Sequence, residues 1–166
     1  MMRRRSSFTV LAAALAVIAG CSLIWPKPRP LFPADLCLHS DPQAQMYRGK
    51  ANSLYVRAYP LKLPDAFNST DVGVLLADPA PPLAGAAGTP QSRMLKPGST
   101  EKLTFDAKEG ETFGFIGVVA GYYDLKGTAK TIVKVEELGA ATCYTVELGP
   151  SGITGSGPAP STAKEK

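Results

Sequence analysis

The sequence predicts a mostly β fold: a two-sheet β-sandwich with one or two short helical insertions. Apolar residues recur with a period of two in several short segments between residues 34 and 149. This period is typical of strands with one face on a core. Turn-forming residues, as at 96–99 and 108–111, separate the segments, and short strands divided by turns indicate a sandwich. We therefore place a single folded domain at residues 34–149.

Residues 1–20 have the features of a lipoprotein signal peptide. Three arginines precede an uncharged run of 12 residues at 8–19, whereas a membrane-spanning helix needs about 20. The run ends in IAGC at 18–21, which matches a lipobox: an aliphatic residue, two small residues and a cysteine. We expect Cys21 to carry a covalent lipid; ordinary secretory cleavage beside a chance cysteine is the alternative. Because Ser22 rather than Asp follows, similarity to enterobacterial sorting signals favours the periplasmic face of the outer membrane.

Two segments of biased composition flank the predicted domain. Residues 22–33 contain four prolines, and such density favours an extended tether that spans roughly 35 Å. Residues 150–166 are rich in Gly, Pro, Ser and Thr, so we expect a disordered C-terminal tail.

Most strands of the domain are predicted to be half-exposed. In each of these segments, apolar residues alternate with polar or smaller ones, so one face meets the core and the other meets solvent. The inward residues are Leu36 and Leu38; Leu54, Val56 and Ala58; Leu103 and Phe105; Val133 and Val135; and Tyr144, Val146 and Leu148.

Residues 112–123 (TFGFIGVVAGYY) differ because both faces are apolar. They predict a central strand covered on both sides, with Gly114, Gly117 and Gly121 permitting close approach or a bulge.

Residues 64–76 interrupt the strand pattern. Pro64 suits the first position of a helix, and Asn68 or Ser69 can cap a second short turn. We expect a one- or two-turn helix that covers the second apolar face of residues 112–123. A long loop rich in Pro and Ala follows at 77–91.

Cys37 and Cys143 are the cysteines that remain beside Cys21. In an oxidising periplasm they are a disulfide candidate, and two separate buried thiols are the alternative. Both lie opposite the leucines of their strands. If the first and last strands are neighbours, the thiols share a face, and directly opposed α-carbons lie within the distance a disulfide accepts. We therefore predict that these strands pair.

The sequence gives little support for catalysis or metal binding. His39 is the only histidine, and no HExxH, CxxC, GxSxG or P-loop spacing occurs. A hydrolase is therefore the weakest interpretation; we expect no enzyme, no metal, no cofactor beyond the lipid and no small-molecule substrate. Cleavage after residue 20 leaves 15 basic against 14 acidic residues, a net charge of +1. This charge argues against a nucleic-acid partner.

Residues 41–52 (DPQAQMYRGKAN) join two predicted strands and are too long for a tight turn. Residue types enriched in protein interfaces occur here, which indicates a partner-binding loop. A mobile loop of ordinary composition is the alternative. The candidate partner-binding residues are Asp41, Gln43, Gln45, Met46, Tyr47, Arg48, Lys50 and Asn52.

An ordered set of motifs resembles the outer-membrane lipoprotein of type VI secretion systems, the TssJ (SciN/VasD) family. The motifs are LYVRAYPLK at 54–62, DAF and STD at 65–71, LKPG at 95–98 and IGVVAGYYDL at 116–125. They correspond to the family's VRVYQLK, AF…AD, L.PG and IGVVAAYRDL, and the match covers most of residues 36–148. Pro60 and Tyr123 stand where Gln and Arg are usual, and the first loop lacks the family's LNP pattern.

This resemblance implies a transthyretin-like sandwich and the role of a structural adaptor. The adaptor would bind the periplasmic C-terminal part of the inner-membrane protein TssM through the loop at 41–52. A periplasmic ligand-binding or pilotin-like lipoprotein unrelated to type VI secretion is the alternative from another class.

Overall fold

The computed structural model describes residues 34–106, 112–137 and 143–158. The predictions for the signal peptide, for the lipid on Cys21 and for the tether at 22–33 concern residues outside these ranges.

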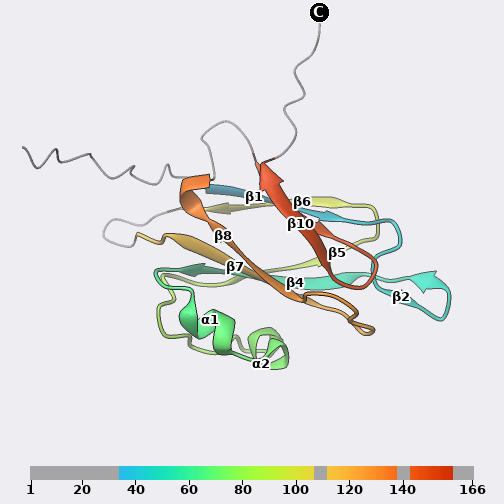
Figure 1. Cartoon of the computed structure of the whole chain (residues 1–166), viewed down its shortest axis with the longest axis horizontal. Coiled ribbons are helices and arrows are strands. Elements are labelled where there is room, and N and C mark those ends of the chain that lie inside the picture. Colours follow the sequence, from blue (N-terminus) through green and yellow to red (C-terminus); the bar gives the residue numbers. More distant parts are fainter. Residues whose placement is uncertain (1–33, 107–111, 138–142, 159–166) are drawn as a thin grey trace, which may run out of the picture.

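Two four-stranded sheets pack face to face (Figure 1), in the strand orders β10-β9-β1-β6 and β5-β4-β7-β8. All neighbouring strands are antiparallel except β1 and β9, which are parallel. The predicted mostly β two-sheet sandwich is thereby confirmed. The strands are β1 (Ala34–Ser40), β2 (Met46–Tyr47), β3 (Lys50–Ala51), β4 (Leu54–Leu61), β5 (Gln91–Leu95), β6 (Thr100–Phe105), β7 (Phe115–Gly121), β8 (Lys130–Lys134), β9 (Tyr144–Leu148) and β10 (Ile153–Pro158).

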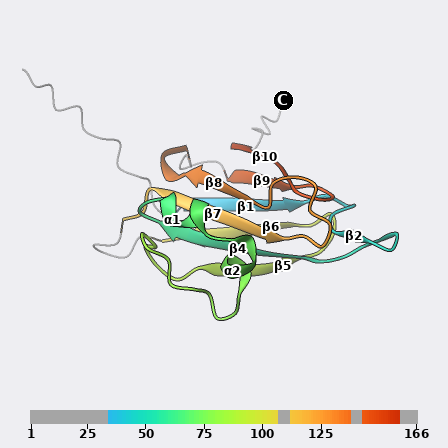
Figure 2. The ribbon, with the colours of Figure 1, turned by 60° about the horizontal axis from the view of Figure 1, so that its bottom comes forward.

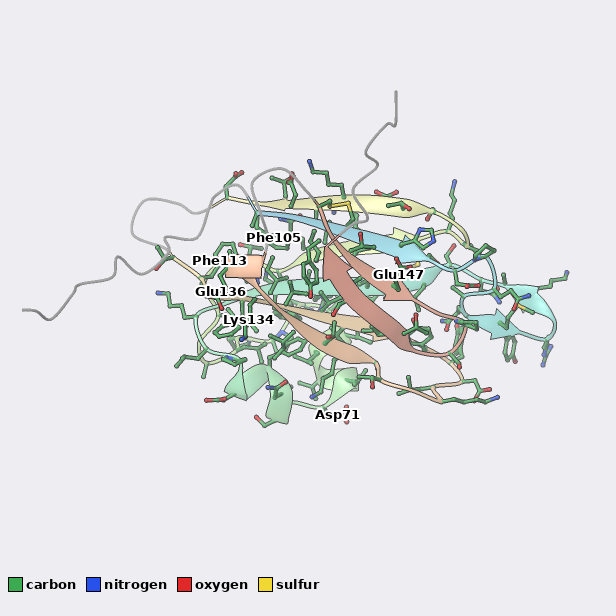
Figure 3. The ribbon with its side chains drawn as sticks, turned by 45° about the horizontal axis from the view of Figure 1, so that its top comes forward. Asp71, Phe105, Phe113, Lys134, Glu136 and Glu147 are labelled. Carbon is green, nitrogen blue, oxygen red and sulfur yellow. A yellow bond between two sulfur atoms is a disulfide. The ribbon has the colours of Figure 1, made fainter. Side chains whose placement is uncertain are left out.

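The core between the sheets consists of the inward half of the period-two pattern. Leu36 and Leu38 of β1 are fully buried, as are Ile116 and Val118 of β7 in the opposite sheet. Phe105 and Phe113 close the core at one end of the sandwich, away from the hairpin of β2 and β3 (Figure 3), with ring centroids 6.2 Å apart. Continuous apolar burial of this kind is the main favourable term in folding.

Two short helices cover the outer face of the second sheet. Helices α1 (Asp65–Ser69) and α2 (Val72–Leu76) lie over β4 and β7 (Figure 2) and form a second apolar cluster with them. The predicted helical cover over a central strand at 112–123 is thus confirmed. The expected caps were wrong in detail: Pro64 is the N-cap of α1, and Asp71 caps α2 by accepting a 2.7 Å hydrogen bond from the Gly73 N–H.

The same cover overturns the prediction that residues 54–59 form a half-exposed strand. β4 is buried on both faces, because its outward side chains lie under α2. Arg57 is only 3% exposed and donates hydrogen bonds to the carbonyl oxygens of Leu75 (3.1 Å) and Ala77. Tyr59 donates to the same Leu75 oxygen. These bonds provide partners for carbonyl oxygens at the end of α2 that have none within the helix. The outward face of β4 therefore contacts α2 and not solvent.

Close packing of α1 on β7 depends on Gly117. A β-carbon at this position would lie 2.8 Å from the Phe67 ring, whereas one at Gly114 would have no neighbour within 4 Å. The predicted close approach therefore holds at Gly117 and not at Gly114.

We predict that Gly117→Ala destabilises the domain by about 1–3 kcal/mol, because overpacking forces Phe67 from its position. Gly114→Ala is the matched control and should change the free energy of unfolding by no more than about 0.5 kcal/mol. Urea denaturation of both variants measures the difference. Equal stability of the two would contradict the proposed contact.

The predicted disordered tail beginning at residue 150 is wrong for residues 150–158. Residues 153–158 form β10, which pairs antiparallel with β9 at the edge of its sheet. An edge strand is held by main-chain hydrogen bonds on one side, so few apolar side chains are needed. Ile153 packs against the core. Residues 159–166 lie outside the described ranges.

Cys37 and Cys143 form a disulfide, with α-carbons 5.6 Å apart. The predicted pairing of the first strand with the strand after Cys143 is present as the parallel pair β1 and β9. The expected direct opposition of the cysteines was wrong. Cys37 is level with Thr145, so the bridge runs diagonally to a residue two positions earlier on the same face.

Removing this bridge with Cys37→Ala and Cys143→Ala together should lower the free energy of unfolding by about 2–4 kcal/mol, because the unfolded chain loses a constraint on a long loop. Urea denaturation of the oxidised domain and of the double variant measures the loss. A reducing agent should destabilise the unmodified domain similarly and leave the double variant unchanged; insensitivity of both would count against the bridge.

Candidate protein-binding surface

Four connections meet at the end of the sandwich where β1 finishes: residues 41–53, 96–99, 122–129 and 149–152. Backbone hydrogen bonds join the first loop to two others. The Asp41 N–H donates to Leu148 O (2.9 Å), and the Asp41 carbonyl accepts from Gly98 N (3.3 Å). The Gln45 N–H donates to Pro150 O at 3.1 Å. In Figure 1, β2 extends furthest beyond the sheets at this end.

The predicted loop at 41–52 contains a short hairpin. β2 and β3 pair antiparallel through Met46 with Ala51 and Tyr47 with Lys50. Arg48 and Gly49 form the reversal, both with positive φ (51° and 74°). Two residues with positive φ are typical of tight hairpin turns, and glycine adopts that conformation without steric cost.

Gln45 fastens this hairpin to the end of β7. Its side chain, in a residue only 6% exposed, donates through Nε2 to Gly121 O (2.9 Å) and accepts at Oε1 from Tyr123 N (3.0 Å). Asn52 donates through Nδ2 to Gln45 O (3.2 Å) and Lys50 O (2.9 Å). These predicted site residues therefore hold the loop in place rather than face solvent.

Asp41 has a similar local role. Its Oδ1 accepts a 2.6 Å hydrogen bond from the Gln43 N–H, an arrangement typical of Asx turns.

The hairpin tip carries the remaining predicted residues, which are exposed. Met46 is 41% and Tyr47 50% exposed, and the Arg48 guanidinium lies over the Tyr47 ring, 5.2 Å from its centroid. Gln43 and Lys50 are also exposed. Exposed apolar and aromatic groups that cluster, as these do, mark contact sites, whereas singly exposed ones are ordinary.

The structure adds residues to this surface that the sequence interpretation missed. Tyr123 is 78% exposed, Leu125 is 44% exposed, and the Tyr123 ring centroid lies 5.6 Å from that of Tyr47. The sequence prediction placed Tyr123 inside a central strand, but β7 ends at Gly121. The turn-forming residues that follow, at 124–127, were the available signal of a loop.

A hollow of about 150 Å³ lies beside the exposed aromatic pair. An ion pair between Lys126 Nζ and Asp124 Oδ2, 3.1 Å long, borders it. Its lining residues come from three of the four connections: Gln45, Met46, Asp124, Lys126, Pro150 and Ser151. Tyr122 precedes the exposed Tyr123 in the chain. Burial raises the pKa of the Tyr122 hydroxyl, because the charged form would lose its hydration, so this group stays neutral.

His39 lies outside this surface cluster: its Nδ1 is 2.8 Å from Thr100 Oγ1 in an exposed pair. In the described ranges, no group of three or more His, Cys, Asp or Glu side chains is placed to hold a metal ion. None of the described helices has the length and apolar character needed to cross a membrane.

The fold and this end surface define a class of protein: a two-sheet sandwich that presents a hairpin and three neighbouring loops for contact. The family model described as "Type VI secretion lipoprotein, VasD, EvfM, TssJ, VC_A0113" matches residues 35–151. The chain therefore belongs to the type VI secretion lipoprotein family, as the sequence motifs indicated.

Solved structures with the same fold agree with this assignment. The crystal structure of the T6SS lipoprotein TssJ1 from Pseudomonas aeruginosa superposes with a TM-score of 0.62 at 25% identity, covering 77% of this chain and 98% of that chain. Serratia marcescens Lip, a membrane-bound component of the type VI secretion system, gives 0.56 at 21% identity, covering 75% and 94%. No curated protein matches the chain by sequence.

A third match is a chain of the structure described as "T6SS protein TssM C-terminal domain (869-1107) from EAEC". Its TM-score is 0.59 at 21% identity, covering 73% of this chain and 94% of that chain. At this identity the likeness concerns the fold.

We predict that Gln45→Leu loosens the hairpin, because the Gly121 carbonyl and the Tyr123 N–H lose their partners at a cost of about 1–3 kcal/mol each if they stay buried. Hydrogen exchange of peptides covering 41–53 and 122–129 should accelerate. The exposed Gln43→Leu serves as control and should leave exchange at 122–129 unchanged. Unaltered exchange in Gln45→Leu would show that its amide does not fasten the loops.

Proposed function

We propose that this protein is the outer-membrane lipoprotein of a type VI secretion membrane complex. Acylated Cys21 anchors it, and its loop end binds the periplasmic C-terminal part of a TssM-like inner-membrane protein. Membership of the type VI secretion lipoprotein family supports the assignment. The resemblance of the motifs at 54–125 to the TssJ family, together with this membership, supports the choice of partner.

The observation that carries this proposal is the separation of the two ends of β1. The strand begins at Ala34, beside Phe105 of β6, directly after the tether at 22–33. It ends at Ser40, where the hairpin and the other loops gather. A lipid attached through the tether therefore joins the domain at the end opposite the loops, which leaves the loop end available to a periplasmic partner.

The chemistry of the loop end suits a protein partner. Met46, Tyr47 and Tyr123 offer exposed apolar and aromatic area, while Arg48 and Lys50 add positive charge at the tip. Aromatic, Met and Arg side chains are the types enriched at interface centres. The two charges favour a partner surface rich in carboxylates.

The pilotin-like or ligand-binding alternative has less support from this surface. The hollow at the loop end, of about 150 Å³, and a larger recess of about 290 Å³ beside Phe105 and Phe113 lie below or at the lower end of the range of about 300–1,000 Å³ typical of small-molecule sites. We therefore propose an adaptor without catalytic activity and without a cofactor other than its lipid.

Replacing Met46, Tyr47 and Arg48 together with Ala should weaken binding to a purified periplasmic TssM fragment at least a hundredfold, because interface energy concentrates in such residues. Calorimetry or biolayer interferometry with the folded domain measures the affinity. Exposed Leu63 lies outside the loop end, and Leu63→Ala is the control. Full affinity of the triple variant, with its circular dichroism unchanged, would refute the assignment of the hairpin.

The anchoring step has its own test. Cys21→Ser should abolish lipid attachment and move the protein from the outer-membrane fraction to the soluble periplasmic fraction, while the domain itself stays folded. Fractionation and immunoblotting against a known lipoprotein measure the shift. Continued membrane association with normal processing would contradict the anchor.

A further inference from the structure

The connection after β7, residues 122–129, exposes large side chains at the loop end, as the predicted hairpin does. Tyr123 is the most exposed large apolar or aromatic residue among those described, at 78%. Its backbone N–H is held by the Gln45 side chain, and its ring contacts Tyr47. Two loops far apart in sequence are thus fixed to each other. The rings of Tyr47 and Tyr123 are exposed on a preorganised surface.

The hollow beside these rings is bounded by a third connection, that between β9 and β10. Pro150 and Ser151 line it on that side, and the Lys126 N–H donates a 3.0 Å hydrogen bond to Ser151 O. The position of the β9–β10 turn is therefore fixed relative to the loop at 122–129. Interfaces commonly pair exposed anchors with such adjacent recesses on the same surface.

The lining of the hollow selects a kind of side chain. Met46 and Pro150 supply apolar surface, whereas Gln45, Ser151 and the Asp124–Lys126 ion pair supply polar atoms. A cavity of similar volume, lined by apolar residues, holds a benzene-sized group. The hollow has the volume for one large side chain, and its mixed lining suits a side chain with both apolar and polar groups.

We propose that the loops at 122–129 and 149–152 form, with the hairpin tip, one continuous binding surface for the TssM-like partner. Tyr123 is an anchor on this surface, and the hollow receives an amphipathic side chain of the partner. This inference rests on the proposed function and adds to it two loops that contribute to affinity. The positive tip formed by Arg48 and Lys50 favours acidic residues around the inserted side chain.

The test compares two changes that leave the hairpin sequence intact. Ser151→Tyr places a ring into the hollow, and Tyr123→Ala removes the anchor. Each should weaken the binding of the purified periplasmic TssM fragment at least tenfold, with circular dichroism and thermal midpoint close to those of the unmodified domain. Ser156→Tyr is the matched control, because Ser156 is exposed on β10 and does not line the hollow; it should bind normally.

Binding of the unmodified domain separates the possible failures. If that domain does not bind the fragment, the proposed function fails. If it binds and both variants keep full affinity, the two added loops are not part of the surface and this inference is overturned. Should Ser151→Tyr fail to fold, Tyr123→Ala decides alone, and a double-mutant cycle with Tyr47→Ala adds a second measure. Coupling between the two tyrosines is expected from their ring contact.

Discussion

Burial of β4 and β7 on both faces is the constraint from which the rest of the structure follows. On the inner side, residues such as Val118 meet the opposite sheet; on the outer side, Val119 meets Phe67 and Leu75 of the two short helices. Helices of five residues have little stability of their own. They persist here because Arg57 and Tyr59 bond to the end of α2 and because Gly117 leaves room for the Phe67 ring.

This rigid pair of strands also positions the binding surface. β7 delivers Gly121 and Tyr123 to the loop end, where the amide of Gln45 bonds to both. The hairpin is consequently not an independent flap on the sandwich. Its orientation is set by β7, a central strand buried on both faces, and rings from two distant segments share one exposed patch. A prepared surface loses less conformational entropy on binding than a mobile one.

Sequence pattern predicted those parts of the fold in which one physical effect dominates. Period-two alternation located most strands, and the doubly apolar stretch at 112–123 indicated a covered central strand. Prediction failed where tertiary context decides. The sequence pattern places Arg57 on the solvent-facing side of its strand, whereas the structure buries it under the helices. β10 has too few apolar residues to be distinguished from a disordered tail by sequence.

The candidate site shows the same division. Residue type pointed to Met46, Tyr47 and Arg48, which are exposed, but it did not distinguish them from Gln45 and Asn52, whose side chains bond within the loops. Tyr123 was assigned to a strand because an aromatic residue suits a strand and an interface equally well. The structure separates the two interpretations, because β7 ends at Gly121, two residues before Tyr123.

The central position of β1 in its sheet has a mechanical consequence. Under the proposed role, its first residue faces the lipid anchor and its last residue faces the partner, so tension between the two membranes acts along the strand. β1 is hydrogen-bonded to β6 on one side and to β9 on the other, and Cys37 links it covalently to Cys143. If the partner also holds the loop at 149–152, as proposed, force passes from β1 to β9, and the hydrogen bonds between these two strands are loaded in shear and resist together. Under the proposed role, this arrangement suits a domain that bears load between the two membranes.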